Sequence, residues 1–320
     1  MCQTAGMSLR AFRTLVAIAE SGSFAAAARA VNLSQSAVST QMRGLEGELN
    51  VALFDRSKRP PVLNEAGEAL VAKARDLIAA YEEMQNAAGS SGAVEGRLRL
   101  GAVGSTLTGV LPPVLTILRE RYPNLHIEIV SGFTEELLQQ LASRALDAAI
   151  VSDHEPGRQD ILWRPFLTEA LVMIAPPDAA ERDPKRLAQR YPFIRYSPTA
   201  AVGRVIERAL RQENLQVRET MRLDWLEAIE AMVHHGHGIA VVPERRIPGH
   251  ALFKVKRVPL GPRRPRRTLG LVELDGSPKR RLTDALFDEL SAVAARRGAR
   301  LRGRKASPSS SPGRARRESR

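Results

Sequence analysis

Cysteine is almost absent from this chain of 320 residues, which has only Cys2. A single cysteine excludes an intrachain disulfide and any zinc site built from several thiolates. Three of the six histidines crowd together as His234, His235 and His237. Imidazoles this close at a predicted helix end do not converge tetrahedrally, so a packed helix terminus is the favoured interpretation. We therefore expect no metal site.

Long apolar runs are missing as well. No stretch approaches the roughly 18–20 consecutive apolar residues of a membrane-spanning helix. The first residues, Met1–Met7, lack the basic segment followed by an apolar one that marks a secretory signal. We expect a cytoplasmic protein with no membrane partner, long enough for two or three folded units.

Catalytic signatures are lacking too. The chain has no Gly-x-Ser-x-Gly elbow, no Walker-type phosphate loop and no paired-carboxylate motif. Gly236-His237-Gly238 is too short for a dinucleotide fingerprint and precedes a predicted strand, whereas such a loop follows one. Asp147 is expected to be structural. We expect no catalytic residue, no cofactor and no enzymatic activity, with an α/β enzyme as the alternative that an activity screen would test.

Positive charge is plentiful but unevenly placed. The net charge is +13, of which residues 296–320 contribute +9 and residues 254–267 contribute +7, while residues 1–60 carry +3. The overall charge is therefore weak evidence for nucleic-acid binding. The run Arg263–Arg267 is either a solvated loop or the mouth of an anion site, and the loop is favoured. The basic tail either adds sequence-independent DNA affinity or is a dispensable extension.

The stretch Ser23–Glu46 has the pattern of two helices separated by a polar turn. Ser23 can cap an Ala-rich helix that ends near Val31, and Ser34 can cap the next one. The apolar stripe of the second helix is Val38, Met42, Leu45 and Leu49. Its other faces carry side chains that can bond base edges or phosphates in a major groove, namely Gln35, Ser36, Ser39, Thr40 and Arg43. An ordinary pair of packed helices with a solvated face is the alternative.

A helix over Ser8–Glu20 precedes this pair and completes a predicted three-helix bundle, with Phe12 and Phe24 as core anchors. After it, the short apolar runs Val51–Phe54 and Val62–Leu63 flank a basic turn, which fits a small β-wing. Cations on such a wing neutralise backbone phosphates beside the reading helix. These cations are Arg56, Lys58 and Arg59.

A long helix is predicted from the cap residue Asn64 to about Ala88. Its apolar residues alternate spacings of three and four over about three heptads, and a second copy of the helix is the economical partner. The seam is Leu70, Ala74, Leu77, Tyr81, Met84 and Ala88. Packing on its own N-terminal unit is the alternative to a homodimer. Gly89-Ser-Ser-Gly92 then forms a hinge.

Beyond the hinge, strands alternate with helices, which predicts an α/β fold with a parallel sheet and two lobes joined by crossing strands. The expected strands are Gly96–Val103, Leu125–Val130, Ala148–Val151, Ile161–Phe166, Ala170–Ala175, Pro192–Tyr196, Thr220–Leu223, Gly238–Pro243, Leu252–Val258 and Thr268–Leu274. The expected helical segments are Thr108–Tyr122, Thr134–Arg144, Pro176–Arg190, Val202–Asn214, Trp225–His234 and Pro278–Ala295. Ligands of such folds bind between the lobes, at strand carboxyl ends and helix N-termini.

The first 80 residues closely resemble the LysR-type transcriptional regulators. The resemblance is carried by Leu9, Phe12, Glu20-Ser-Gly-Ser-Phe24, Leu33-Ser-Gln-Ser-Ala-Val-Ser39, Leu45-Glu46, Leu53-Phe54-Asp-Arg56 and Leu63-Asn-Glu-Ala-Gly67. The later region is similar to the family's effector domain, which resembles periplasmic binding proteins, through Arg97-Leu-Arg-Leu-Gly101, Leu146-Asp147 and Gly236–Pro243. Asn50 and Asn64 depart from the family's usual Gly and Thr, and both can serve the same backbone turn or cap.

The sequence pattern and the resemblance together divide the chain into four expected parts, of which the last is inferred from its Arg-, Ser-, Pro- and Gly-rich composition. These are a winged helix-turn-helix domain over 7–65, a linker helix and hinge over 66–90, an effector domain over 91–295, and a disordered basic tail over 296–320. The effector domain would consist of lobe I (91–162 and 268–295) and lobe II (163–267). The implied partners are double-stranded promoter DNA, further copies of the chain in a homodimer or homotetramer, a small-molecule effector, and RNA polymerase. A nonspecific, nucleoid-type DNA-binding protein is the alternative.

The resemblance also assigns sites. It places Gln35, Ser36, Ser39, Thr40 and Arg43 on the DNA, with Arg56, Lys58 and Arg59 on the wing. Ser105 and Thr106 match positions at which family members hold an effector carboxylate, and hydroxyls at a helix N-terminus favour an anion. Ordinary capping is the alternative for each hydroxyl. Further effector-site candidates are Thr134, Ser152, Tyr196, Thr199 and Trp225.

Overall fold

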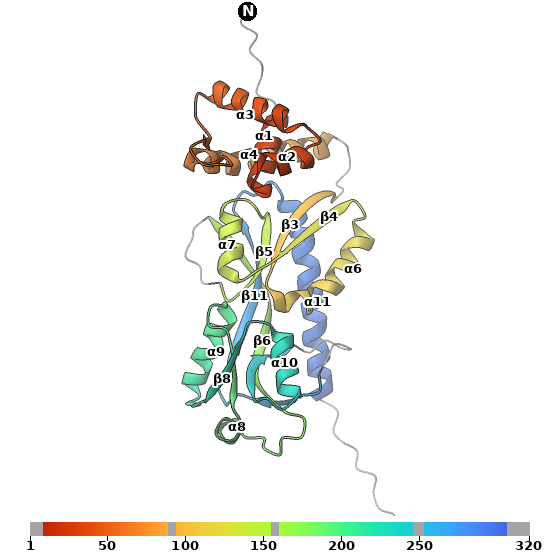
Figure 1. The fold of residues 1–320 in the computed structure, drawn as a ribbon. Helices are drawn as coiled ribbons and strands as arrows, with labels where there is room; N and C mark the ends of the chain where they lie inside the picture. The colour runs from red at the N-terminus through yellow and green to blue at the C-terminus, as the bar shows by residue number, and fades with distance from the viewer. Residues whose placement is uncertain (1–8, 89–93, 155–159, 246–252, 306–320) are drawn as a thin grey trace, which may run out of the picture.

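The computed structural model describes residues 9–88, 94–154, 160–245 and 253–305. It is an elongated molecule with a helical N-terminal unit at one end and a two-lobed sheet domain beneath it (Figure 1). The predicted hinge at 89–92, the tail beyond 305, and Cys2 lie outside the described residues. In the described part, no helix is both long and apolar enough to cross a membrane.

The N-terminal unit has the predicted helix-turn-helix. Serine side chains cap two of its helices, because Ser23 Oγ accepts a hydrogen bond from the Ala26 amide and Ser34 Oγ accepts one from the Ala37 amide. The predicted anchor Phe12 and stripe residue Val38 are both in the buried core. Its helices are α1 (Leu9–Ser21), α2 (Phe24–Ala30) and α3 (Gln35–Leu49).

Two asparagines act as the sequence predicted. Asn50 ends α3 in the left-handed conformation, with φ of 50°. The Asn64 side chain accepts a hydrogen bond from the Gly67 amide at the start of the next helix. A Cβ at Gly67 would lie 2.3 Å from the Leu53 carbonyl oxygen, so this glycine lets that helix approach the wing closely. The wing pairs β1 (Phe54–Asp55) with β2 (Val62–Leu63) in antiparallel register.

The long helix α4 (Glu65–Ala88) divides its predicted seam in two. Leu70 and Ala74 pack in the core of the N-terminal unit, against α1. Leu77, Tyr81 and Met84 stay exposed, while the Ala88 side chain lies outside the described set. Packing on its own unit therefore accounts for the first half of the seam only.

Lobe I contains the predicted parallel strands β3 (Gly96–Ala102), β4 (Leu125–Ser131) and β5 (Ala148–Ser152), with β3 in the middle. The expected helix over Thr108–Tyr122 is wrong at its start. The chain instead forms α5 (Gly104–Leu107), breaks, and begins α6 (Leu111–Arg121) with prolines in the first turn. Proline is tolerated there and disfavoured farther in, which sets the break. The helix α7 (Thr134–Ala142) follows β4 as expected.

Two long strands connect the lobes. The expected pair of strands over Ile161–Phe166 and Ala170–Ala175 is one continuous strand, β6 (Ile161–Ala175), which runs antiparallel to β11 (Arg266–Leu274). Its polar middle interrupts the apolar pattern where the strand leaves one core and enters the other. The described strands here form a seven-stranded sheet in the order β10-β6-β11-β5-β3-β4, with β9 also paired to β6.

Lobe II packs around a separate apolar core. The polar segment Pro176–Arg190 is helical only in its last part, where Asp183 accepts a hydrogen bond from the Arg186 amide and caps the helix. The strand expected from Leu252 begins later, at Lys256. The elements of this lobe are α8 (Pro184–Arg190), β7 (Phe193–Tyr196), α9 (Ala201–Gln212), β8 (Glu219–Leu223), α10 (Leu226–His234), β9 (Ala240–Pro243) and β10 (Lys256–Pro259).

The closing helix α11 (Arg280–Lys305) packs on lobe I and continues past the expected end at 295. The described helix thus takes in the first part of the segment expected to be disordered. Alanine, arginine and leucine have high helix propensity, so this stretch extends a helix that is already nucleated.

Candidate nucleic-acid interface and ligand cleft

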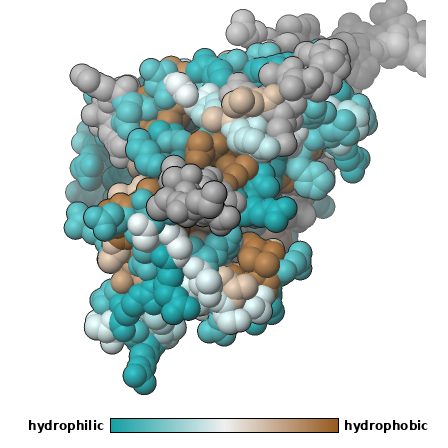
Figure 2. Space-filling view, turned by 90° about the horizontal axis from the view of Figure 1, so that it is seen from above, coloured by the Kyte–Doolittle hydropathy of each residue, from teal (hydrophilic) through white to brown (hydrophobic). Residues whose placement is uncertain are grey.

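The helix α3 presents the predicted reading residues on its outer side. Gln35, Ser36, Thr40 and Arg43 are exposed, while Ser39 is half-buried. Ser36 Oγ lies 2.9 Å from the Oγ of the cap residue Ser34. Seen from above, this end of the molecule is largely hydrophilic with separate apolar patches (Figure 2). The exposed face of α3 therefore offers hydrogen-bonding groups from the helix start onward and a cation, Arg43, farther along the helix.

The wing cations differ in their surroundings. Lys58 and Arg59 are exposed. Arg56 instead pairs with Glu46 of α3 at 2.6 Å, and the same carboxylate accepts a hydrogen bond from the Leu53 amide. Burial acts to raise the pKa of Glu46, but these bonds and the Arg56 charge outweigh it and lower that pKa. Arg56 thus ties the wing to the reading helix.

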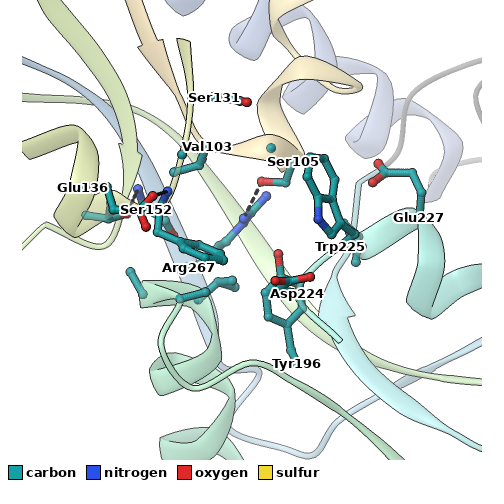
Figure 3. A pocket seen from close by; sticks show the side chains of 18 residues that line it. Val103, Ser105, Ser131, Glu136, Ser152, Tyr196, Asp224, Trp225, Glu227 and Arg267 are labelled. Carbon is teal, nitrogen blue, oxygen red and sulfur yellow. Dashed lines mark hydrogen bonds between the residues drawn. The ribbon is translucent and has the colours of Figure 1, made fainter. Parts of the chain in front are cut away.

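A cleft of about 190 Å³ lies between the lobes (Figure 3). It is lined by five of the predicted effector residues: Ser105, Thr134, Ser152, Tyr196 and Trp225. Thr106 and Thr199 do not line it. The Thr106 hydroxyl is buried and donates to the Val103 carbonyl, and the Thr199 hydroxyl bonds to Ser197. Topology brings the five together because β3, β4, β5, β7 and β8 all end at this space.

Arg267 is the residue of the cleft that sequence reasoning placed wrongly. It belongs to the run expected to be a solvated loop, yet only 1% of it is exposed. It lies opposite Glu169 across the strands that join the lobes, and its Nε and Nη2 donate to Glu169 Oε2 at 2.8 and 2.6 Å. Its Nη1 donates to Ser105 Oγ at 2.9 Å (Figure 3). A buried cation therefore underlies the cleft and contacts lobe I.

Tyr196 contributes a second polar group from lobe II. Only 7% of this residue is exposed, and no hydrogen bond joins its hydroxyl to any described residue. Burial raises the pKa of Tyr196, with the charge of Arg267 acting against it. The hydroxyl therefore stays protonated and can donate a hydrogen bond.

Polar contacts across the lobes flank the cleft. On one side, Glu227 of α10 accepts hydrogen bonds from Thr108 at 2.5 Å and from Arg245 at 2.8 Å, and Arg245 also donates to Thr108. On the other side, Arg204 of α9 pairs with Glu135 of α7. These contacts hold the lobes together in the arrangement that the structure shows.

Further cleft residues escaped the sequence analysis. The reasoning that residues at strand ends face a shared edge selected Thr134 and Ser152, and it would also have selected Ser131 and Asp224, which end or follow β4 and β8. No local signal distinguished Arg267 from its exposed neighbours. The polar cleft residues outside the predicted set are Ser131, Glu136, Asp224, Glu227 and Arg267.

The histidine group at the end of α10 and Asp147 were considered above as candidate sites, and both make hydrogen-bond contacts within the fold. Within the described residues, no group of three or more His, Cys, Asp or Glu side chains could hold a metal ion. The Nδ1 atom of His234 lies 2.9 Å from the Lys254 carbonyl oxygen. Asp147 accepts hydrogen bonds from the backbone and side chain of Arg99, which orders the start of β5.

Comparisons with protein families identify both the N-terminal helical unit and the two-lobed domain. The model described as the LysR substrate binding domain matches residues 91–295, well over half of the chain. The model of the bacterial regulatory helix-turn-helix protein, lysR family, matches residues 9–68. The chain belongs to the LysR family. It is a LysR-type transcriptional regulator with a DNA-binding unit and an effector-binding domain.

Curated LysR relatives cover most of the chain. The RuBisCO operon transcriptional regulator of Allochromatium vinosum is 31% identical over 242 residues, which covers 74% of this chain and 79% of the relative. The hydrogen peroxide-inducible genes activator of Haemophilus influenzae is 27% identical over 301 residues and covers 90% and 98%.

Solved structures share the whole architecture. A full-length OxyR variant from Pseudomonas aeruginosa aligns with a TM-score of 0.71 at 24% identity, covering 91% of this chain and 97% of that one. Full-length CbnR in complex with its target DNA aligns with a TM-score of 0.58 at 20% identity, covering 88% and 100%. At these identities the likeness concerns the fold.

Proposed function

We propose that this LysR-family regulator recognises a specific promoter sequence through α3 and changes its promoter binding when a small molecule with an anionic group enters the cleft. The observation that carries the proposal is the cleft itself, in which a buried cation and hydroxyl donors from both lobes face one space. Because family members act on DNA, we place the protein in the cytoplasm of a bacterial cell.

In this proposal, α3 reads base edges with Gln35, Ser36, Ser39 and Thr40. Arg43, Lys58 and Arg59 supply positive charge to bases or phosphates. Arg56 contributes mainly by holding the wing against α3, because its guanidinium already pairs with Glu46. Contacts to base edges separate this function from nonspecific, nucleoid-type binding, because phosphate contacts add affinity without sequence information.

The exposed stripe of Leu77, Tyr81 and Met84 supports a homodimer through α4, since apolar side chains on a regular helix stripe gain by burial against a second copy. A homotetramer and contact with RNA polymerase follow from the family rather than from a described surface. We infer no catalytic activity, and an activity screen of the effector domain tests this.

In the cleft, the effector's anionic group would lie against Ser105, Arg267 and Tyr196. Thr134, Ser152 and Trp225 would surround the rest of the molecule. Thr106 would act indirectly, by fixing the turn that carries Ser105, and Thr199 would hold the Ser197 turn beside α9.

Substituting Arg43→Ala tests the DNA-reading assignment. We expect promoter affinity to fall by about 1–3 kcal/mol, because a contact to a base or phosphate is removed. Gel shifts with the cognate promoter and with random DNA of equal length measure the loss. Arg186→Ala, an exposed cation on α8 in lobe II, is the matched control. Equal promoter affinity in the two variants would overturn the placement of the reading face.

A further inference from the structure

The charges around the cleft do not balance. Two arginine pairs are neutral: Arg267 with Glu169, and Arg245 with Glu227. The remaining charged lining residues are Glu136 and Asp224. One oxygen of Glu136 accepts a hydrogen bond from the Phe133 amide, and no ion pair offsets its charge among the described residues. The cleft therefore carries an excess of negative charge. Its floor, formed by Ser105, Arg267 and Tyr196, nevertheless presents hydrogen-bond donors.

The floor suits a carboxylate. Arg267 leaves the Ser105 hydroxyl hydrogen free to donate, since the Ser105 oxygen is the acceptor of the Arg267 bond. The buried Tyr196 hydroxyl is a second donor without a described partner. The helices α9 and α10 also begin at the cleft after Ala200 and Trp225, neither of which caps its helix through a side chain. The N-terminal end of a helix favours a negative charge.

The rim of the cleft, formed by Asp224 and Trp225, suits a cation. Asp224 is exposed at the cleft, and no hydrogen bond or ion pair joins its carboxylate to a described residue. Beside it, 57% of Trp225 is exposed, and its ring approaches Gly104 of lobe I. Figure 3 shows Asp224 and Trp225 facing the space above Tyr196, across from Arg267. A carboxylate and an exposed indole together are the surroundings that an ammonium group prefers.

We propose that the cleft selects a zwitterion, a small carboxylic acid that also carries an ammonium group. Its carboxylate lies against Ser105, Arg267 and Tyr196, and its ammonium group lies against Asp224 and Trp225. This inference rests on the proposed function of the cleft as the effector site. A simple monocarboxylate leaves Asp224 without a partner, and a dicarboxylate or phosphate ester brings a second negative charge to a rim that is already negative.

The test compares matched acids that differ only in the amine. The full chain is titrated by calorimetry with amino acids bearing the amine at the α, β or γ carbon or on an aromatic ring, each beside the same acid without the amine. We expect at least one amine-bearing acid to bind, with affinity at least tenfold above that of its amine-free partner. A panel in which amine-free acids bind equally well, or in which no amine-bearing acid binds, overturns the proposal.

Substituting Asp224→Asn identifies the residue that recognises the ammonium group. The amide keeps the shape of the side chain, so we expect at least tenfold weaker binding of the amine-bearing acid. Binding of its amine-free partner stays the same or becomes tighter, because a negative charge is removed from the rim. Asp178→Asn, an exposed carboxylate between β6 and α8, is the control and leaves both affinities unchanged. Equal losses for both acids would show that Asp224 acts through the structure of the cleft and would overturn its role.

The experiment separates the two proposals. Substituting Ser105→Ala weakens both members of a pair if the carboxylate lies at the floor. If Ser105→Ala lowers affinity while Asp224→Asn does not, the cleft remains the effector site and the zwitterion is wrong. If neither substitution changes the affinity of a bound acid, the cleft is not the site and both proposals fail.

Discussion

Arg267 is a cation with 1% of its surface exposed, and its ion pair with Glu169 offsets the desolvation that this burial costs. Both residues lie on the strands that connect the lobes, directly under the cleft. The arginine then uses its remaining Nη1 hydrogen bond on Ser105 of lobe I. Arg267 thus links the two strands that connect the lobes, β6 and β11, to the floor of the cleft.

Substituting Arg267→Ala leaves the Glu169 carboxylate buried without a cation. We expect the free energy of unfolding to fall by about 3–5 kcal/mol, the range found when one partner of a buried ion pair is removed. Urea denaturation monitored by circular dichroism measures it. The paired replacement Arg267→Met with Glu169→Leu removes both charges, and we expect it to cost much less. A single variant as stable as the wild type would contradict this account.

Glu227 gives the interlobe contact a pH dependence. Burial acts to raise its pKa, but hydrogen bonds from Thr108 and Arg245 and the Arg245 charge lower it below 4.5 overall. A carboxyl whose folded-state pKa is lowered adds stability above its unfolded pKa, and that stability is lost as pH falls through the folded value.

We therefore expect the difference in melting temperature between the wild type and Glu227→Gln to be constant above about pH 5 and to shrink as the pH falls below 4.5. Thermal melts from pH 3 to 7 measure it. Asp178→Asn, which touches neither lobe contact, is the control and should leave the profile of the wild type. A difference that grows on acidification would reverse the assigned sign.

At the scale of elements, the two halves of the single helix α4 have different surroundings. Its first half is buried on α1, and its second half carries an exposed apolar stripe of Leu77, Tyr81 and Met84. The helix also contacts lobe I through two charged residues. Arg75 donates to the Ser143 carbonyl at 3.0 Å, and Asp76 pairs with Arg144 at 2.5 Å.

Substituting Leu77→Asp places a charge in the exposed stripe. We expect the dimer to dissociate at concentrations at least tenfold higher than for the wild type, because a charge buried in an apolar seam is desolvated without a partner. Analytical ultracentrifugation over a concentration series measures this. Ala69→Asp adds the same charge at an exposed position of α4 outside the stripe. If both variants dimerise alike, α4 is not the interface.

At the scale of the whole molecule, α7 connects the cleft to the linker helix. Of its first residues, Thr134 lines the cleft and Glu135 pairs with Arg204 of lobe II. Just beyond its other end, Ser143 and Arg144 contact α4. A change in lobe spacing that shifts α7 would therefore act on the helix that carries the DNA-binding unit.

Substituting Arg144→Ala breaks the ion pair at the linker end of α7. We expect faster hydrogen exchange over α4 and a weaker effect of bound ligand on promoter affinity, with ligand affinity itself changed little. Mass-spectrometric exchange and gel shifts with and without ligand measure the two effects. Arg119→Ala, exposed on α6, is the control. An unaltered ligand effect on promoter affinity would remove this contact from the coupling route.

Local sequence determined the elements of this protein. The caps Ser23, Ser34 and Asn64, the left-handed Asn50 and the spacing of apolar residues act over a few positions, and the structure has the predicted helix-turn-helix, wing and α/β alternation. The errors fall where local pattern competes with tertiary context. The continuous β6 is the example, since pairing with β11 carries it through its polar middle. The break before α6 has a local cause instead, because the prolines of its first turn are disfavoured farther inside a helix.

The cleft was determined only in part by sequence. Hydroxyl and aromatic residues at strand ends could be named because chain direction places such ends at one edge of a parallel sheet. The burial of Arg267 could not, because the residues that cover it and pair with it, Ser105 and Glu169, are far away along the chain. Sequence therefore decided which elements form, through short-range geometry, whereas the tertiary structure decided which charges are paired, buried or left facing the cleft.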